Sequence, residues 1–223
     1  MLDRATEDAL YTIFAEFFRH AEKERRWDLW NDIDWQAVSA SPSERLRQAV
    51  LAAYAQEIFL PDLSIEMIQR LRSSRGRAWF LTRWTYEEGK HILALSEWLS
   101  RSGTKTDEEL KELNEELLGP HQWVLPSKDP VSALVFALVR EFAEAAYYEQ
   151  LRGLAKDEND AALVAVCDCI LRDEHKHEAF FVQVLEKVRQ FEPAHIENAL
   201  REIGELSEAA PWMETVHATL NGN

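Results

Sequence analysis

The chain has 223 residues, of which 46% are hydrophobic, and it carries a formal net charge of −15 at pH 7. This length suits one domain with a substantial core, and the acidic balance argues against a nucleic-acid surface and favours solubility. Seven Gly and seven Pro are few for such a chain, which favours long helices over many short strands. We therefore expect an all-α protein with one domain over residues 1–223.

The compartment is indicated by the two cysteines and by the apolar runs. Cys167 and Cys169 stand two residues apart in a helical stretch, so they point in different directions and do not easily bridge. No charged-then-apolar leader opens the sequence, and no apolar run approaches the roughly 18 residues of a membrane span. The sequence thus predicts a reducing, cytoplasmic setting with neither membrane nor nucleic acid as a partner.

Hydrophobic periodicity and capping residues set out the helices in chain order. Predicted helices cover about 7–24, 41–70 with an interruption at Pro61, 74–102, 106–118, 129–153, 160–190, and a shorter segment from 193. Ser41 is the expected N-cap of the second helix, and the tail beyond Pro211 is expected to be loosely ordered. Residues 1–40 then form an N-terminal helix and a Trp-rich link, 41–190 a bundle of long helices, and 191–223 a C-terminal helix and tail.

Two Glu-x-x-His pairs lie in the middle of long predicted helices, Glu88 with His91 and Glu174 with His177. Residues i and i+3 share a helix face, so each pair can hold one metal ion. Each pair also interrupts an apolar stripe, where a charged Glu is costly unless it is paired or metal-bound. The alternative is a buried Glu–His hydrogen bond without metal. Two further pairs, Glu192/His195 and Glu214/His217, have no obvious partner helix and are expected to be solvated.

A paired metal site of this kind needs one more carboxylate from each partner helix. Glu57 is the only acid in a long apolar window and precedes Glu88 by 31 residues (88 − 57), while Glu141 precedes Glu174 by 33 (174 − 141). In a hairpin of two antiparallel helices, residues separated by this number of positions lie at the same level along the bundle axis, so each carboxylate can face its Glu-x-x-His pair. The predicted ligands are Glu57, Glu88, His91, Glu141, Glu174 and His177. Four carboxylates and two imidazoles suit two iron ions with dioxygen as co-substrate, whereas zinc prefers four ligands and has no redox chemistry.

These motifs resemble those of the soluble acyl-carrier-protein desaturases, which are ferritin-like di-iron proteins. The Trp-rich segment from Arg77 to His91 resembles that family's Glu-Glu-x-x-His segment, and the segment from Asp173 to Glu178 resembles its Asp-Glu-x-x-His-Glu segment. Glu57, shortly before Pro61, resembles the family's first ligand position. The resemblance covers about residues 25–190 and implies a ferritin-like four-helix bundle with additional flanking helices.

The resemblance also implies an activity and partners. Two ferrous ions would activate dioxygen to remove hydrogens from an unactivated C–H pair of an acyl chain, held by thioester on an acyl carrier protein. Electrons would come from a ferredoxin-like donor, and the protein would be a homodimer. By similarity, Asp173 and Trp84 would support the ligands by contacts from outside the ligand set. Trp27 or Trp30 would lie on an electron path, or would simply anchor helix packing.

Two features leave the reaction open. The plant members are considerably longer, and Glu144 falls where the family has a Thr near the dioxygen site, so this extra acid could ligate metal, donate protons or redirect the reaction. Alternatives to desaturation are therefore hydroxylation or oxidation of another small molecule, metal binding or iron storage without an organic substrate, and a purely structural role. Because a carrier protein is acidic, docking it would need a basic patch. The candidates are Arg70, Arg72, Arg75 and Arg77, which could equally be a solvated helix junction.

Overall fold

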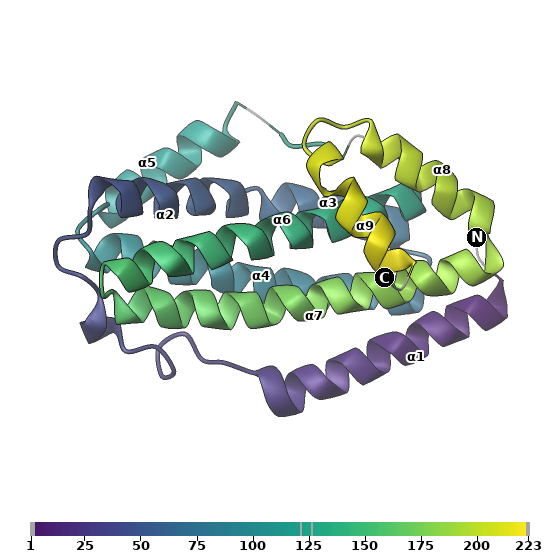
Figure 1. Ribbon diagram of the computed structural model, residues 1–223, viewed down its shortest axis with the longest axis horizontal. Coiled ribbons are helices and arrows are strands. Elements are labelled where there is room, and N and C mark those ends of the chain that lie inside the picture. Colours follow the sequence, from purple (N-terminus) through teal and green to yellow (C-terminus); the bar gives the residue numbers. More distant parts are fainter. Residues whose placement is uncertain (1–2, 121, 126, 222–223) are drawn as a thin grey trace.

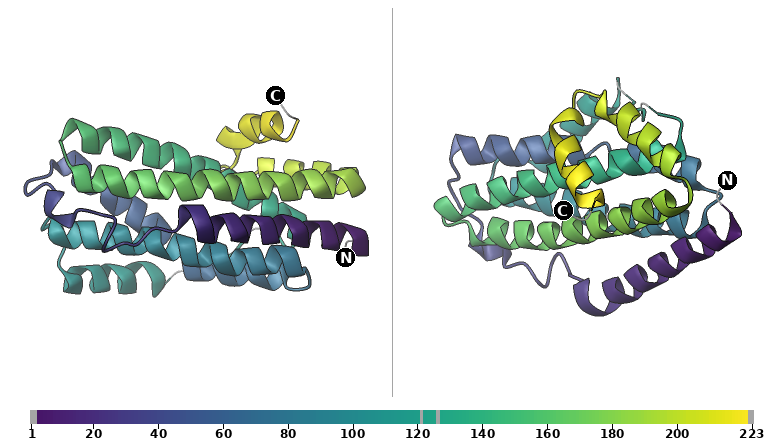
Figure 2. Two further views of the ribbon diagram at one scale, coloured as in Figure 1. Left: turned by 90° about the horizontal axis from the view of Figure 1, so that it is seen from below. Right: turned by 45° about the vertical axis from the view of Figure 1, so that its right-hand side comes forward.

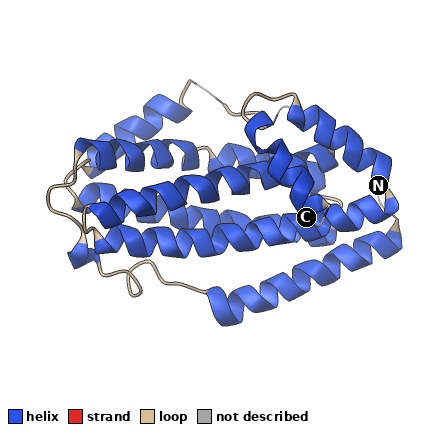
Figure 3. Cartoon of the chain, viewed as in Figure 1, coloured by secondary structure: helices blue, strands red, loops and turns tan. Residues whose placement is uncertain are grey.

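The computed structural model describes residues 3–120, 122–125 and 127–221, and every regular element in these ranges is helical (Figure 3). The elements are α1 Arg4–His20, α2 Glu44–Glu57, α3 Leu60–Leu71, α4 Arg75–Arg101, α5 Asp107–Leu118, α6 Pro130–Asp157, α7 Ala161–Phe191, α8 Pro193–Gly204 and α9 Met213–Leu220. A π-helical turn, Ala21–Arg25, follows α1, and short 3₁₀ turns occupy Trp35–Ala37 and Ala210–Trp212.

A four-membered helical bundle forms the centre of the molecule. The helices α4, α6 and α7 run its length, and α2 and α3 together form the fourth member, broken at Ile58 and Phe59 (Figure 1). The helix α1 packs along α4 and α7, while α8 and α9 lie against α6 and α7 at the end of the bundle where α7 finishes (Figures 1 and 2). The two halves of the bundle are thus two helical hairpins, α2/α3 with α4 and α6 with α7.

Two apolar clusters fill the bundle, one toward each end. One centres on Leu46, Trp98 and Val166, and the other on Phe80, Leu138 and Phe181, all of them fully buried. At roughly 25 cal/mol per Å² of buried apolar surface, side chains of this size supply most of the stabilisation of the fold. The polar residues discussed below lie between these two clusters, where the helices are held rigidly on both sides.

Local capping chemistry explains most of the helix boundaries. Pro61 lies in the first turn of α3, which confirms the predicted interruption, and Gly103, with φ +69°, ends α4 as expected. The helix α2 begins two residues later than predicted, because the hydroxyl of Ser43, not that of Ser41, caps Leu46 N at 3.1 Å. The helix α6 continues one turn past Gly153, because Asn159 supplies the left-handed residue that ends it.

The C-terminal segment differs from expectation. The tail beyond Pro211 was predicted to be loosely ordered, but it forms α9, and Val216 and Leu220 enter the core next to α7. The prediction was wrong because an eight-residue helix has little intrinsic stability, whereas packing of its apolar face supplies what local propensity lacks. Within the described part of the chain, no helix combines the length and the hydrophobicity that a membrane crossing requires.

Candidate metal centre

Six side chains from four helices converge between the two apolar clusters. Each of the six is at most 1% exposed. Glu57 is the last residue of α2, and the others lie near the middle of α4, α6 and α7. Their ligand atoms form two groups, each within 4.8 Å, and Glu88 belongs to both groups. The groups are Glu57, Glu88 and His91, and Glu88, Glu141, Glu174 and His177. All six sequence-predicted ligands are therefore brought together.

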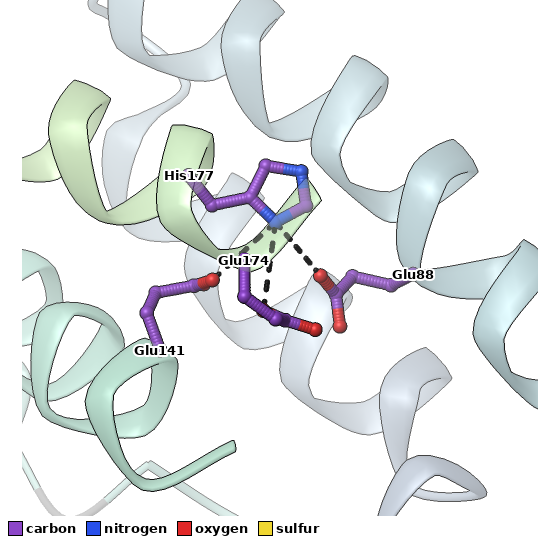
Figure 4. Close-up of side chains that lie close together, drawn as sticks. All are labelled: Glu88, Glu141, Glu174 and His177. Atoms are coloured by element: carbon purple, nitrogen blue, oxygen red, sulfur yellow. Dashed lines mark ion pairs between the residues drawn. The ribbon is translucent and has the colours of Figure 1, made fainter. Parts of the chain in front are cut away.

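The Nδ1 atom of each histidine faces the carboxylates. Nδ1 of His177 lies 3.1 Å from Glu88 Oε1, 3.3 Å from Glu141 Oε2 and 3.8 Å from Glu174 Oε2 (Figure 4). Nδ1 of His91 lies 3.2 Å from Glu174 Oε1 and 3.7 Å from Glu88 Oε2. Despite these short distances, both oxygens of Glu88, both of Glu174 and Nδ1 of both histidines are buried without a hydrogen-bond partner. These oxygen and nitrogen atoms could each ligate a metal ion, and they all face a common centre without a hydrogen bond. A pair of metal ions requires such an arrangement.

The charges around the centre support the same interpretation. Three outer carboxylates each lie next to a cation: Glu87 next to Arg83 at 3.1 Å, Asp173 next to Lys90 at 3.7 Å, and Glu144 next to Arg140 at 2.5 Å. The four inner carboxylates, Glu57, Glu88, Glu141 and Glu174, carry four negative charges that two divalent cations would neutralise. Oxygen and imidazole donors in this ratio fit iron or manganese, so the residues present fit a di-metal cofactor.

Burial and mutual repulsion perturb the inner carboxylates strongly. Burial, together with the charge of Glu88, raises the pKa of Glu57 to about 7, and burial holds the pKa of Glu141 well above its ordinary value. Burial would lower the pKa of His91 and His177, but the carboxylates around them raise it well above the ordinary value. Without metal ions, bound protons neutralise part of the negative charge of this cluster. Metal binding must displace these protons.

An outer layer of side chains orients the ligands. Nε1 of Trp84 donates a hydrogen bond to Glu141 Oε1 at 2.9 Å. Nε2 of His91 lies 3.6 Å from Asp173 Oδ2, and this carboxylate also accepts a hydrogen bond from Trp27 Nε1 at 2.7 Å. Trp84 and Asp173 therefore stand where supporting partners of the ligands were predicted. Trp27 is buried and reaches His91 through Asp173, whereas Trp30 is 64% exposed and is not part of this chain of contacts.

Three residues around the centre were not singled out from the sequence. Glu87 Oε2 lies 3.0 Å from His177 Nε2, so it occupies the position at His177 that Asp173 occupies at His91. Tyr148 donates a hydrogen bond from its hydroxyl to Glu57 Oε1 at 2.7 Å, and Arg140 Nη2 donates to Glu57 Oε2 at 3.4 Å. One sequence signal was available for Arg140, which is the only Lys or Arg between Lys128 and Arg152.

Glu144, the additional acid of α6, lies next to the centre but belongs to neither ligand group. Its Oε1 accepts a hydrogen bond from Arg140 Nε at 2.5 Å, and its Oε2 is buried without a partner. Glu141 therefore lies among the ligands, whereas Glu144 pairs with Arg140, which also contacts Glu57. The register proposed for α6 from the sequence agrees with this placement.

The expected four-arginine docking patch is not present as one surface. Arg70 pairs with Glu66 at 2.7 Å and donates to Ser127 O, and Arg77 pairs with Glu7 at 2.9 Å. These two side chains turn inward because acidic and carbonyl partners from other segments meet them at the junction of α3 and α4. Only Arg72 and Arg75 are exposed, and the guanidinium of Arg75 lies over the ring of Tyr11 at 3.6 Å.

The two outlying Glu-x-x-His pairs lie away from the centre. Glu214 and His217 are exposed, as expected, whereas Glu192 and His195 are half-buried and not fully solvated. His195 joins Glu192 and Asp129, each at 2.8 Å, and its side chain is 37% exposed. Neither this pair nor Glu214 with His217 contributes to a potential ligand group among the described residues.

Comparison with known proteins places this geometry in a family. Residues 60–208 match the family model described as fatty acid desaturase. The chain belongs to this family. Curated relatives include stearoyl-(acyl-carrier-protein) 9-desaturase 5 of Arabidopsis thaliana and the acyl-(acyl-carrier-protein) 6-desaturase of Thunbergia alata, each 26% identical over 110 residues, which cover 49% of this chain and 28% of the relative. The match thus spans less than a third of the length of these relatives.

Solved structures share the fold over nearly the whole chain. DesA2 of Mycobacterium tuberculosis, assigned to the acyl-ACP desaturases, is similar with a TM-score of 0.61 and 20% identity, covering 98% of this chain and 88% of that one. A mutant R2-like ligand-binding oxidase with a reconstituted Mn/Fe cofactor is similar with a TM-score of 0.58 and 17% identity, covering 96% and 86% of the two chains. The predicted all-α, ferritin-like bundle with flanking helices is confirmed.

Proposed function

We propose that this member of the fatty acid desaturase family is a dioxygen-dependent di-iron oxidoreductase that introduces a double bond into an acyl chain. The observation that carries the proposal is the centre itself: six buried ligands whose donor atoms point at one another, most of them without a hydrogen bond. A structural role would leave these polar atoms buried at a cost of about 1–3 kcal/mol each.

The residues divide into two metal positions with shared ligands. Glu57 and His91 would hold one ion, Glu141 and His177 the other, and Glu88 with Glu174 would lie between them, as the two ligand groups and the distances suggest. When bound, two iron ions would supply the redox equivalents that activate dioxygen. The burial of the centre excludes bulk water, which protects reactive species from side reactions.

Electrons and substrate would arrive from partners. Trp27, Asp173 and His91 form a continuous contact path from α4 and α7 to the link that follows α1, and we propose this path for electrons from a ferredoxin-like donor. The curated relatives named above act on acyl groups attached to acyl carrier protein, which supports a thioester-bound acyl substrate here. A homodimer and a cytoplasmic setting remain predictions from the sequence.

A specific observation favours a second candidate, oxidation or hydroxylation of a smaller molecule. An ion pair, Arg140 with Glu144, stands directly beside Glu57, at the inner end of a pocket of only about 300 Å³. A volume of this kind is at the lower end of the range for small-molecule sites. The extra acid and the small volume of this pocket would suit a ligand smaller than a long acyl chain.

The deciding experiment is product analysis with iron-loaded, reduced protein. Acyl chains of several lengths, attached to acyl carrier protein, are exposed to dioxygen in the presence of reduced ferredoxin. The masses of the products are then measured by mass spectrometry. Desaturation removes two hydrogens from the acyl chain, whereas hydroxylation adds one oxygen. The proposal predicts the loss of two hydrogens in the wild type and no product in Glu88→Ala. A gain of oxygen would replace desaturation with hydroxylation of the acyl chain. No turnover of any acyl chain by a fully loaded protein would refute the proposal and would favour the second candidate.

A further inference from the structure

The four inner carboxylates of the metal centre differ in their hydrogen-bond partners. Three of them have at least one oxygen that is buried without a partner in the described part of the chain, namely Glu88, Glu141 and Glu174. Glu57 instead has a partner on each oxygen. The hydroxyl of Tyr148 donates to Oε1 at 2.7 Å, and Nη2 of Arg140 donates to Oε2 at 3.4 Å. Glu57 is therefore the carboxylate that must give up an existing contact before both of its oxygens can turn to a metal ion.

The contact that matters most is the one with a charge. The guanidinium of Arg140 lies between two carboxylates, with Nε 2.5 Å from Glu144 Oε1 and Nη2 3.4 Å from Glu57 Oε2. None of the three side chains is more than 15% exposed, so solvent and salt screen these charges only weakly. The positive charge of Arg140 holds the Glu57 carboxylate, and it also repels a divalent cation that approaches Glu57.

The corresponding carboxylate at the other end of the centre has a neutral partner. Glu141 Oε1 accepts a hydrogen bond from the indole of Trp84 at 2.9 Å, and Oε2 lies 3.3 Å from Nδ1 of His177. A carboxylate has two oxygens, so it can keep a neutral donor on one of them while the other ligates a metal ion. A metal ion can thus bind at Glu141 without breaking an ion pair with Arg or Lys, whereas at Glu57 it has to break one.

The number of ligands that are already close together differs in the same direction. At the Glu141 end, shown in Figure 4, four ligand atoms lie within 4.8 Å of one another, whereas three do so at the Glu57 end. Ligands that are already assembled need little rearrangement, which favours binding. Glu88 belongs to both groups, so the ion that binds first also orders a carboxylate that the second ion shares.

We propose that the metal centre fills in two steps and that Arg140 controls the second step. The first ion binds at the four-ligand group, Glu88, Glu141, Glu174 and His177. The second ion binds beside Glu57 and His91, after the Glu57 carboxylate has moved away from Arg140. The inference rests on the proposed function in taking the six residues as the ligands of two iron ions, and it adds the order in which the two positions fill. Arg140 is a positioning residue, because it acts through Glu57.

Metal binding in the absence of dioxygen tests this order. Metal-free protein is titrated with Fe²⁺ by calorimetry, and crystals grown with one equivalent of Fe²⁺ are measured by anomalous X-ray scattering. We expect two binding steps, the first about tenfold or more tighter than the second, since only the second breaks a hydrogen bond between charged groups. At one equivalent of Fe²⁺, the iron peak should lie beside Glu141 and His177.

A double variant, Arg140→Met with Glu144→Gln, releases Glu57 without changing the net charge. The new side chains are similar in length to those they replace, and neutral groups in place of a buried ion pair are often tolerated. Without a guanidinium on Glu57 Oε2, the second Fe²⁺ should bind about tenfold more tightly than in the wild type, and the first step should change little. A purely structural role of Arg140 would not alter one step selectively.

The matched control is Glu97→Gln with Arg101→Met, which removes a partly exposed i,i+4 ion pair of α4 and should leave both steps unchanged. The proposal is overturned if the two ions bind the wild type equally tightly, if the first iron peak lies beside Glu57, or if the Arg140 double variant leaves the second step unchanged. Should circular dichroism show that this variant is unfolded, the wild-type crystals decide alone.

The result separates this inference from the proposed function. Two-step loading without oxidation of any acyl chain by the fully loaded protein would refute the proposed function and leave the order of loading intact. Equal binding of both ions with normal desaturation would refute only the order of loading. Failure to bind Fe²⁺ at all would refute both.

Discussion

The two ends of the metal centre have the same types of ligand but different surrounding contacts. At each end a Glu-x-x-His pair meets one carboxylate from a partner helix, and the outer nitrogen of each histidine faces a second carboxylate, Asp173 at His91 and Glu87 at His177. The carboxylates that come from the partner helices, Glu57 and Glu141, differ in their hydrogen-bond partners. Glu141 is held by the neutral indole of Trp84, whereas Glu57 is held by Tyr148 and by the charged Arg140.

The surroundings follow the same division. Trp84 continues into an aromatic cluster that contains Phe80, Phe180 and Phe181, and Phe80 and Phe180 stack with their ring centroids 3.4 Å apart. The Glu57 end instead adjoins the break between α2 and α3 and the pocket lined by Arg140 and Glu144. The two ends therefore differ in what supports the carboxylate of the partner helix and in what surrounds it.

The largest loss of metal is expected for the ligand that both ends of the centre share. Glu88 belongs to both ligand groups, so Glu88→Ala should lose both metal ions, and His177→Ala should lose at least one, because each removes a ligand that nothing nearby replaces. Metal analysis of protein from iron-supplemented cells, with circular dichroism for helical content, checks this. Both variants should remain largely helical. The matched control is His217→Ala, which alters an outlying Glu-x-x-His pair and should keep the wild-type metal content.

A comparison within α6 comes next in size. Glu141→Ala should lose about one metal ion per chain, whereas Glu144→Ala should keep both, since Glu144 is paired with Arg140 and lies outside both ligand groups. Metal content per chain measures the difference. The reverse order would place the fourth carboxylate one helical turn further along α6.

The supporting hydrogen bonds should have smaller and unequal effects. Glu141 Oε1 has Trp84 as its partner, so Trp84→Phe should weaken metal affinity by roughly 10–100-fold. Tyr148→Phe should cost less, because Arg140 still contacts Glu57. Competition with a chelator gives both affinities. Equal losses in the two variants would mean that the ends of the centre are not differently supported.

The smallest effect concerns pH. The pKa of Glu57 is raised to about 7, above the value of an unfolded chain, so its neutral form stabilises the metal-free fold at low pH and this contribution is lost as pH rises through about 7. Metal binds the deprotonated carboxylate, so through Glu57 alone affinity should fall by about fivefold from about pH 7 to about pH 6. The raised pKa of His91 and His177 acts in the same direction. Chelator competition across this range checks the slope, and an affinity that rises on acidification would contradict it.

The sequence predicts the ligands because helical spacing is a local property. Glu88 with His91, and Glu174 with His177, share faces by their i,i+3 separation, and the apolar stripes around them indicate that these faces are buried. The long helices follow from periodicity and caps in the same way. Glu57 is recognisable because no other acid lies near it in its apolar window.

What the sequence does not reveal depends on partners that are distant along the chain. Arg77 turns inward because Glu7, 70 residues away, accepts its hydrogen bond, and Arg140 meets Glu57 across 83 residues. Glu87 resembles an ordinary surface acid next to Glu88 until α7 places His177 beside it. The helix α9 depends on packing against α7 and not on its own propensity.

The most direct test of the central claim is anomalous X-ray scattering from crystals of the iron-loaded protein. We predict two iron peaks about 3.5–4 Å apart, as in other two-metal sites, one beside Glu57 and His91 and the other beside Glu141 and His177, with Glu88 contacting both. A single peak, or none at this place in fully loaded protein, would contradict the assignment of these six residues as a di-iron centre.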